Sequence, residues 1–247
     1  MSSPTRSGPP PQRGIGVVSP FDLALDRELW RWVPDDVSLY LTRTPYVAGP
    51  VSIELAEQLS EEADVARATK DVIAPGPLVV AYACTSGSFV HGLDGERRLR
   101  QAMCACGAPA AVTTSGALLE ALGALDARRV AVATPYVADV TARLHDFLSE
   151  AGMAVVSSAH LGLDADIWKV QYETTARLIR EADSPGADVV FVSCTNLPTY
   201  DLIAPLEREL AKPVLTANQV TMWAALRIAG ATAVGPGQRL LAHSLQP

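Results

Sequence analysis

Two stretches of the sequence look like copies of one another: VVAYACTS at residues 79–86 and VVFVSCTN at residues 189–196. Each is an apolar run that ends in a Cys-Thr pair followed by a small polar residue. The two cysteines, Cys84 and Cys194, lie 110 residues apart, which is close to half of the 247-residue chain. We therefore interpret the chain as a duplicated unit that carries one thiol in each copy.

The rest of the chain alternates apolar strand-like runs with amphipathic helical segments, in the same order in both halves. Strands are expected at residues 13–20, 37–43, 77–83 and 109–113, and again at 129–135, 153–158, 188–193 and 212–216. Helices are expected at 21–32, 51–72, 95–106 and 114–125, and again at 137–151, 164–182, 198–210 and 219–229. Such alternation is typical of parallel βαβ units. The sequence therefore predicts an α/β protein of two pseudo-symmetric, doubly wound parallel-sheet (flavodoxin-like) lobes, with the active site between them.

The expected domain boundaries follow from this repeat. Residues 1–13 are rich in Pro and Ser and are expected to be a disordered tail. The N-terminal α/β lobe is expected at 14–115 and the C-terminal lobe at 116–237, followed by a C-terminal tail at 238–247. The alternative that the last long helix crosses back to the first lobe stays open.

The composition of the chain limits which binding partners and which cellular compartment we expect. Hydrophobic residues make up 49 % of the chain and the formal net charge is −7. Without a cluster of Lys and Arg among aromatic residues, nucleic acid and anionic membranes are not expected as partners. No apolar run approaches the roughly 20 residues that span a bilayer. The first residues do not resemble a secretory signal, so we expect a cytoplasmic protein whose four cysteines are reduced thiols.

Four residues lie at the carboxyl ends of the expected strands: Ser19, Cys84, Thr134 and Cys194. Ligands of open parallel sheets bind outside these ends, so we expect all four residues to face one cleft. Two thiols on opposite sides of a small carbon centre support two related reactions. One thiolate removes a proton while the other thiol donates one to the opposite face, or one thiolate adds to a double bond while the other thiol protonates the neighbouring carbon. Neither reaction needs a metal or an organic cofactor.

The residues beside the thiols suit the binding of oxygen atoms. Hydroxyl, amide and backbone N–H groups that can hold carboxylate or enolate oxygens are supplied by Thr85, Ser86, Thr195 and Asn196. Tyr136 could donate its phenol to a substrate oxygen or simply pack, and Arg43 could pair with a carboxylate or stay solvated.

The same residues allow other interpretations. Cys84 and Cys194 could be small buried hydrophobic residues, but two of them at equivalent repeat positions favour function. Cys104 and Cys106 are interpreted as packing residues. The four histidines show no metal-ligand spacing, and no Gly-rich motif follows a strand, so we expect neither a metal nor a nucleotide site.

These motifs resemble the aspartate/glutamate racemase superfamily, in particular its branch of maleate cis-trans isomerases and arylmalonate decarboxylases. The resemblance runs from about residue 14 to about residue 237. It is most specific at residues 84–86, 134–136 and 194–196, and it includes the linking segments at 113–118 and 130–134. It implies a cofactor-independent two-lobe enzyme with Cys84 and Cys194 as the catalytic pair. It also implies that Thr85, Ser86 and Tyr136 form an oxyanion pocket, and it implies a homo-oligomer, a dimer or larger.

The resemblance also separates the branches. The decarboxylases typically keep the second-half cysteine and have Gly at the first position, whereas this chain has Cys84, which favours a two-thiol isomerase or racemase. Our first hypothesis is an isomerase of a small dicarboxylate, converting maleate to fumarate, with Cys84 as nucleophile and Cys194 as proton donor. The carboxylates would be bound by Ser19, Thr85, Ser86, Tyr136, Thr195 and Asn196.

Three alternatives remain open. The first is a racemase of an amino acid or hydantoin, and the second is an arylmalonate-type decarboxylase. The third is a non-catalytic module that binds a small acid between its two lobes.

Overall fold

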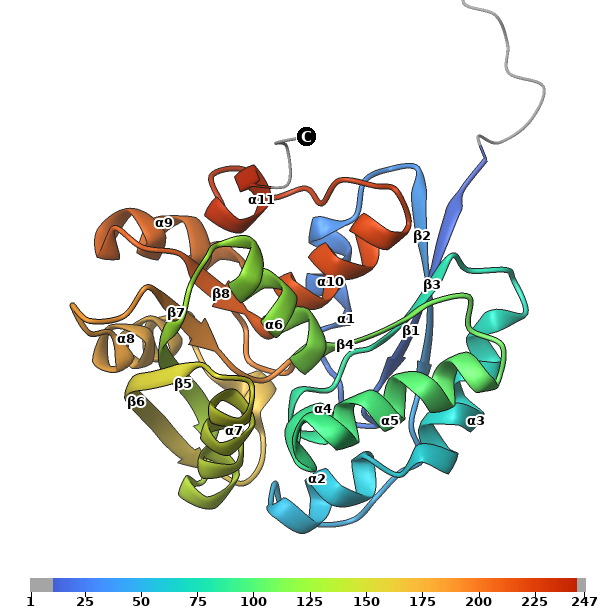
Figure 1. Cartoon of the computed structure of the whole chain (residues 1–247), viewed down its shortest axis with the longest axis horizontal. Coiled ribbons are helices and arrows are strands. Elements are labelled where there is room, and N and C mark those ends of the chain that lie inside the picture. Colours follow the sequence, from blue (N-terminus) through green and yellow to red (C-terminus); the bar gives the residue numbers. More distant parts are fainter. Residues whose placement is uncertain (1–10, 244–247) are drawn as a thin grey trace, which may run out of the picture.

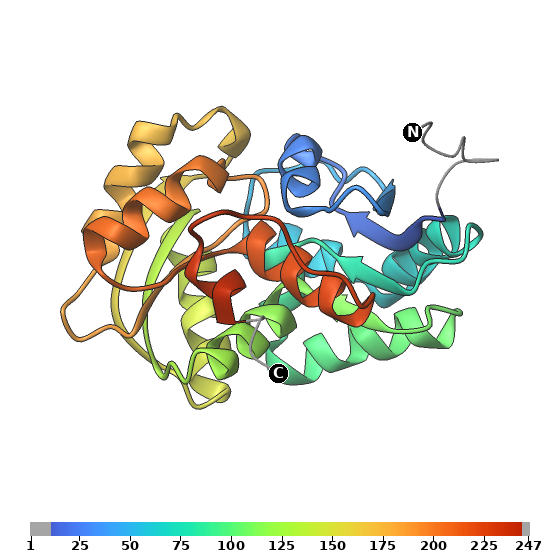
Figure 2. The same cartoon turned by 90° about the horizontal axis from the view of Figure 1, so that it is seen from above.

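The computed structural model describes residues 11–243, and within them the chain forms two four-stranded parallel sheets that lie side by side (Figures 1 and 2). The first sheet has the strand order β2-β1-β3-β4 and the second has β6-β5-β7-β8. Each strand thus has a counterpart at the same place in the other sheet, and the predicted pseudo-symmetric α/β fold is confirmed. The strands are β1 (Arg13–Ser19), β2 (Val37–Arg43), β3 (Val79–Tyr82), β4 (Ala111–Thr113), β5 (Arg129–Tyr136), β6 (Ala154–Leu163), β7 (Val189–Val192) and β8 (Val214–Thr216).

Helices cover both sheets. In the first half they are α1 (Asp26–Leu29), the 3-10 helix η1 (Trp30–Trp32), α2 (Ile53–Leu59), α3 (Glu62–Ile73), α4 (Thr85–Phe89), α5 (Gly92–Ala105) and α6 (Thr114–Ala124). In the second half they are α7 (Ala138–Glu150), the 3-10 helix η2 (Ile167–Lys169), α8 (Tyr172–Ala182), α9 (Tyr200–Leu210), α10 (Ala217–Ile228) and α11 (Arg239–His243). The segment expected as a C-terminal tail thus contains α11. Residues 1–10 and 244–247 of the two expected tails lie outside the described residues.

The central strands β3 and β7 place the two thiols. Strand β3 pairs with β1 and β4, and β7 pairs with β5 and β8. Every residue of both strands is buried, as the continuous apolar runs at their positions predict for strands covered on both faces. Cys84 and Cys194 follow these strands at their carboxyl ends, so the repeat delivers each thiol to the same edge of its sheet.

Helices α6 and α10 start in the same way and join the two halves. The hydroxyl of Thr113 accepts a hydrogen bond from the backbone N–H of Gly116 (2.9 Å), and that of Thr216 accepts one from Gln219 (3.4 Å). Threonine at this position satisfies a backbone donor that the first helical turn leaves free. The two helices pack against each other in the middle of the molecule (Figure 1), and α10 also packs against β3 and β4. The last long helix therefore reaches back to the first sheet.

Some helices differ from their predicted extents. The single helix predicted at 51–72 is two helices, because Ser60 ends α2 and its hydroxyl donates to the carbonyl of Glu57 (2.6 Å). The helix predicted at 21–32 is reduced to α1 and η1. The helix predicted at 164–182 begins only at Tyr172, because Asp166 has a left-handed backbone (φ 56°). The Gly/Ser-rich turn predicted after Cys84 is the short helix α4.

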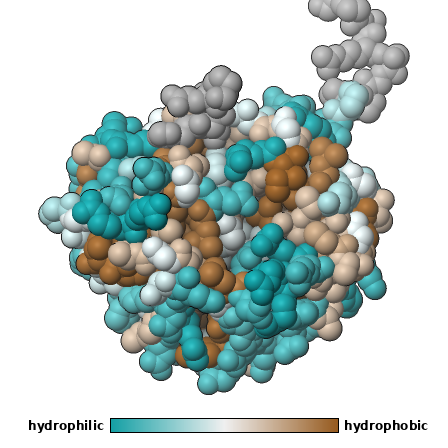
Figure 3. Space-filling model, in the orientation of Figure 1, coloured by the Kyte–Doolittle hydropathy of each residue, from teal (hydrophilic) through white to brown (hydrophobic). Residues whose placement is uncertain are grey.

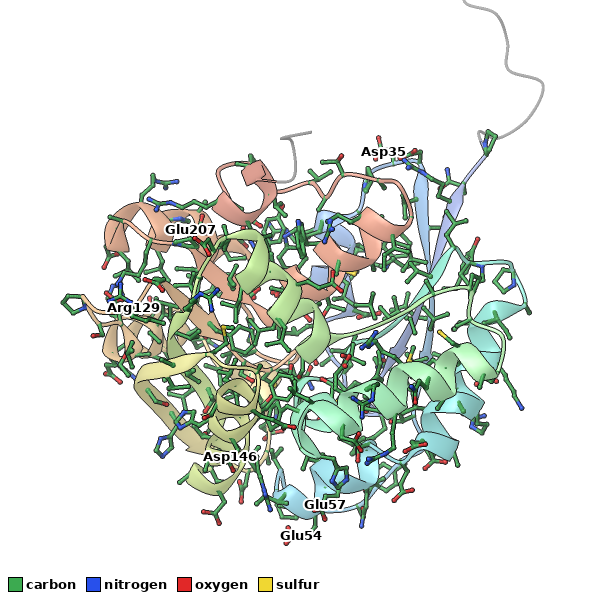
Figure 4. All side chains as sticks on the ribbon, viewed as in Figure 1. Asp35, Glu54, Glu57, Arg129, Asp146 and Glu207 are labelled. Carbon is green, nitrogen blue, oxygen red and sulfur yellow. The ribbon has the colours of Figure 1, made fainter. Side chains whose placement is uncertain are left out.

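Charged side chains lie at the periphery of the molecule. Hydrophilic residues cover the outward face of α5 (Figure 3), and Glu54 and Glu57 lie at the rim on α2 (Figure 4). Arg129 starts β5 and pairs with Asp188 (2.8 Å), at the end of the second sheet opposite to Cys194. Between residues 11 and 243, no helix is long and apolar enough to cross a bilayer.

Candidate active site

A small cavity of about 40 Å³ lies at the carboxyl ends of the central strands, and both thiols line it. The first lobe contributes Pro20, Asp22, Val51, Ser52, Leu55, Ala56, Leu59, Cys84, Thr85 and Ser86, and the second contributes Tyr136, Ile167, Cys194, Thr195 and Asn196. The predicted meeting of the two Cys-Thr stretches at one cavity is therefore observed. Among these lining residues there is no Lys, Arg or His. A ligand would be held by hydroxyl and N–H groups, not by an ion pair.

Cys84 lies at the first turn after β3 and its side chain is 3 % exposed. Burial raises the pKa of its thiol from 9.0 to about 11, because a thiolate loses its hydration there. The backbone N–H of Gly87 opposes this rise in the pKa by hydrogen bonding to the sulfur. The Tyr82 hydroxyl supplies no such bond, because its single proton is donated to the carbonyl of Leu59 (2.5 Å). Cys84 is thus neutral at rest, with one donor already placed to stabilise its thiolate.

Cys194 is the counterpart after β7 and is 8 % exposed. Its backbone is left-handed, with φ 87°, a conformation that L side chains rarely adopt. The backbone N–H of Asn196 donates a hydrogen bond to its sulfur (3.3 Å). Burial raises the pKa of this thiol to about 12, although the Asn196 N–H and the Tyr136 hydroxyl partly offset the rise. The second thiol, like the first, is therefore protonated at rest.

Thr85 and Tyr136 bring hydroxyl groups to the cavity between the thiols. The Oγ1 atom of Thr85 is buried without a hydrogen-bond partner, which is the expected state of a group that serves a ligand. The Tyr136 hydroxyl accepts a hydrogen bond from Ser193 (3.4 Å), and burial raises its pKa well above the ordinary value. Tyr136 is therefore a neutral donor, consistent with a place in an oxyanion pocket.

Ser19 and Thr134 lie at the predicted strand ends but do not line the cavity. The Ser19 hydroxyl donates to the carbonyl of Thr42 (3.1 Å), and the Thr134 hydroxyl bonds with that of Thr141 (2.6 Å). The expectation that these two residues face the cleft therefore needs correction, because both hydroxyls are turned into their own lobes. Pro20, the next residue after Ser19, lines the cavity in its place.

Asn196 lines the cavity, but its side-chain amide joins the two lobes. Its Nδ2 donates to the carbonyl of Asp22 (2.9 Å), and its Oδ1 accepts from the backbone N–H of Ala24 (2.8 Å). Arg43 holds the same first-lobe segment by donating to the carbonyl of Leu23 (2.7 Å). The part of Asn196 that serves the site is therefore its backbone N–H on Cys194.

Asp22 is the main feature that the sequence analysis missed, since the residue falls within the helix predicted at 21–32. It is the acidic residue among those lining the cavity. Burial raises the pKa of its carboxyl group, and the charge of Arg43 lowers it. The charge of Asp22 in turn raises the pKa of both Cys84 and Cys194, so the carboxyl group is close enough to influence both thiols. No local signal in the sequence marks this residue, because the path of its segment is held by Arg43 and Asn196.

The apolar wall of the cavity was also not predicted. It comes from α2 and the segment before it, through Val51, Leu55, Ala56 and Leu59, and from Ile167 of η2.

Within residues 11–243, no three His, Cys, Asp or Glu side chains are grouped so that they could hold a metal ion.

Comparison with known proteins places this geometry among characterised enzymes. The family model described as arylmalonate decarboxylase matches residues 52–242, a range that includes both thiols. The chain is 34 % identical to arylmalonate decarboxylase of Bordetella bronchiseptica over 159 residues, covering 63 % of this chain and 66 % of that protein. It is 30 % identical to a maleate isomerase of Pseudomonas putida over 167 residues, covering 64 % and 67 %. These alignments thus span about two thirds of each relative.

Solved structures extend the match to nearly the whole fold. A cysteine-to-serine mutant of Nocardia farcinica maleate cis-trans isomerase, with a covalently bound succinylcysteine intermediate, superposes with a TM-score of 0.83. That match has 26 % sequence identity and covers 93 % of this chain and 98 % of that structure.

Proposed function

The chain belongs to the arylmalonate decarboxylase family, and on that premise we propose that it is a cofactor-independent isomerase that converts maleate to fumarate. The observation that carries the proposal is the presence of Cys84 and Cys194 on one cavity. Maleate isomerases are among the relatives, and one of them has been captured with a succinylcysteine intermediate. A thiol that adds to a four-carbon alkene diacid gives this kind of adduct.

We assign the addition to Cys84 and the protonation to Cys194, because the decarboxylases of the family typically keep only the second-half cysteine, so the step that distinguishes the isomerase falls to the first-half thiol. Burial raises the pKa of both thiols, so both are neutral before a substrate binds. The Cys84 thiolate adds to one alkene carbon, and the electron pair of the double bond moves to the adjacent carbon and its carboxylate. Cys194 then protonates that carbon. The resulting C–C single bond rotates, Cys194 takes the proton back, and the C–S bond breaks to release fumarate.

The proton of Cys84 needs an acceptor before the addition. Asp22 is the acidic residue among those lining the cavity, and burial raises the pKa of its carboxyl group, which makes it a stronger base. We assign the transfer from the Cys84 thiol to this carboxylate. The proton returns to Cys84 when the product leaves.

The substrate carboxylates are assigned to the hydroxyl groups of the cavity. Thr85 has a free buried hydroxyl, Tyr136 is a neutral phenol, and Ser86 and Thr195 lie beside the thiols. These groups can stabilise the charge that develops on a carboxylate when the double bond is attacked. Ser19 is not included because its hydroxyl is bonded to Thr42.

Decarboxylation of an arylmalonate is the second candidate, favoured by the 34 % identity to arylmalonate decarboxylase. The apolar wall from α2 would also suit an aryl ring. One observation favours the isomerase: the first-half thiol is present and lines the cavity.

The deciding experiment follows purified protein in heavy water by proton NMR, with maleate, phenylmalonate and single-enantiomer amino acids as separate substrates. We expect fumarate to form from maleate. The variants Cys84→Ser and Cys194→Ser should lose this turnover, and Cys104→Ser should keep it because that thiol is exposed on α5. Full turnover in either of the first two variants, or conversion of phenylmalonate to phenylacetate and carbon dioxide without any fumarate from maleate, would overturn the proposal.

A further inference from the structure

Equivalent residues of the repeat form hydrogen bonds to the two thiol loops, residues 84–86 and 194–196, which begin at the cavity cysteines. Ser115 and Asn218 are each the second residue of the helix that follows the last strand of their half. The Ser115 hydroxyl donates to the carbonyl of Thr85 (3.3 Å), and the Asn218 Nδ2 donates to the carbonyl of Thr195 (2.9 Å). In both halves, therefore, the side chain at the same helix position donates a hydrogen bond to the backbone carbonyl of the residue that follows the cavity cysteine. All four residues are buried.

The hydrogen bond from Asn218 to the Thr195 carbonyl also affects the hydrogen bond that the Cys194 sulfur accepts. The carbonyl of Thr195 and the N–H of Asn196 belong to one planar peptide unit. That N–H is the donor to the Cys194 sulfur at 3.3 Å. A side chain that fixes the carbonyl therefore also fixes the direction of the N–H, and it polarises the peptide in the sense that strengthens the bond to a thiolate.

The backbone at Cys194 needs this support more than the backbone at Cys84. Cys194 has φ 87°, whereas Cys84 has φ −138°, within the ordinary extended region. A left-handed backbone at a residue with a side chain persists only where its surroundings hold it. Asn218 supplies such a restraint one residue beyond the strained position.

The restraint on Cys194 also depends on the first lobe. The second hydrogen of the Asn218 amide points to Oε1 of Glu28 (3.2 Å), a buried residue of α1. The Glu28 carboxylate is fixed by the backbone N–H of Thr199 (3.0 Å) and by its hydroxyl (2.8 Å). A carboxylate from one lobe thus orients the amide that holds the thiol loop of the other.

The first thiol loop is held with more redundancy. The carbonyl of Thr85 has two hydroxyl donors within reach, that of Ser88 at 2.9 Å and that of Ser115 at 3.3 Å, and the two hydroxyl oxygens lie 2.7 Å apart. Because the pair carries only two protons, one serine alone donates to the carbonyl whenever the two hydroxyls bond with each other. Loss of one hydroxyl leaves the other in place. The loop of Cys194 has a single side chain, that of Asn218, on the equivalent carbonyl among the hydrogen bonds of the described residues.

We propose that Asn218, oriented by Glu28, is a positioning residue that sets the reactivity of Cys194, and that Ser115 is its repeat-related counterpart for Cys84. This inference deepens the proposed function, on which it rests only in treating Cys84 and Cys194 as the reacting thiols.

The test measures the rate at which iodoacetamide alkylates each cysteine of the full chain, by mass spectrometry of its peptides at one fixed mildly alkaline pH. The other cavity thiol of the same molecule is the internal control. In Asn218→Ala we expect the Cys194 rate to fall about tenfold, as for a rise of about one unit in its pKa, while the Cys84 rate changes less than about twofold. In Ser115→Ala we expect the Cys84 rate to fall by only about twofold to threefold, because Ser88 remains, with the Cys194 rate unchanged.

Two further variants separate positioning from a general loss of structure. Asn218→Ser places at this position the hydroxyl that serves the other half, and should recover most of the Cys194 rate. Gln219→Ala removes a buried amide from the next position of α10, where it bonds with Gln238 (2.8 Å), and should leave both thiols unchanged. If Asn218→Ala does not fold, Glu28→Gln tests the same relay and should lower the Cys194 rate alone.

The proposal is overturned if the Cys194 rate in Asn218→Ala is unchanged or higher, or if both thiols change together. Because alkylation needs no substrate, the outcome is independent of the proposed reaction. A wild-type protein that fails to isomerise maleate but shows these selective changes would refute the function and leave the inference standing.

Discussion

The hydroxyl of Tyr82 donates a hydrogen bond of 2.5 Å to the carbonyl oxygen of Leu59. Tyr82 is the last residue of β3, two positions before Cys84, and Leu59 ends the helix that forms the apolar wall of the cavity. Because its single proton goes to Leu59, this hydroxyl is not a donor to the Cys84 sulfur. One buried phenol therefore fixes the end of the helix that walls the site, on the strand that leads to the proposed nucleophile.

Tyr82→Phe should weaken both the fold and the reaction. The Leu59 carbonyl loses its buried partner, which should reduce the free energy of unfolding by about 1–3 kcal/mol in urea denaturation. The end of α2 also loses its anchor, which should loosen the apolar wall of the cavity, so kcat/KM should fall. Tyr46→Phe is the matched control, since Tyr46 is 77 % exposed and should change neither quantity. Unchanged kcat/KM in Tyr82→Phe would show that this hydrogen bond does not shape the cavity.

Gly87 is required by a close approach beneath the first thiol. A Cβ atom at this position would lie 2.6 Å from the Tyr82 hydroxyl and 3.1 Å from the Cys84 sulfur. Gly87→Ala must therefore displace one of them. We expect kcat/KM to fall at least about tenfold, which corresponds to a loss of roughly 1.4 kcal/mol of transition-state stabilisation.

The matched control for this change is Gly123→Ala in α6, where an added Cβ meets nothing within 4 Å. It should keep full activity and raise the free energy of unfolding by about 0.5–1 kcal/mol, the usual gain in a helix interior. If Gly87→Ala behaves like Gly123→Ala, the contact around Cys84 is looser than the structure shows.

The thiols and their strands could be predicted because the signal is local and occurs twice. An apolar run that ends in Cys-Thr requires only a buried parallel strand, and β3 and β7 supply it. The break between α2 and α3 has no such signal. Ser60 and Glu61 occur readily within helices, and the end of α2 is stabilised by Tyr82, which lies more than 20 residues away in sequence.

The segment after β1 could not be predicted for the same reason. Which of its residues faces the cavity depends on the path of the chain from Pro20 to Leu25. That path is held by Arg43 from β2 and by Asn196 from the other lobe. Ser19 was therefore assigned to the cleft, and Asp22 was overlooked. The strand ends are set by local sequence, and the loops between them by contacts distant in sequence.

Stability should fall in alkaline solution because of the two cavity thiols. Burial raises the pKa of Cys84 from 9.0 to about 11 and that of Cys194 from 9.0 to about 12, so the folded protein binds these protons more tightly than the unfolded chain. The stabilisation is complete below about pH 9 and is lost as the pH rises towards 11 and 12. Within this window each thiol should lower the free energy of unfolding by up to about 1.4 kcal/mol per pH unit.

Urea denaturation at several pH values between about 8.5 and 10 measures this slope. The double variant with Cys84→Ser and Cys194→Ser should show a clearly flatter dependence over the same range. Parallel curves for the two proteins would mean that the thiols are not protected from ionisation in the folded state.

Asp22→Asn should lower kcat but speed the alkylation of both cavity thiols. The charge of Asp22 raises the pKa of both thiols, so its removal should let iodoacetamide alkylate Cys84 and Cys194 faster at a fixed pH. The same change removes the carboxylate to which we assign the Cys84 proton, so kcat should fall about 10²-fold or more.

Asp26→Asn, four residues further along on α1, is the control and should alter neither rate. The opposite signs make the result specific, because a disturbed fold would lower activity without a matched rise at both cavity thiols. Faster alkylation together with faster turnover would mean that Asp22 only repels the substrate, and the acceptor of the Cys84 proton would then have to be a carboxylate of the substrate itself.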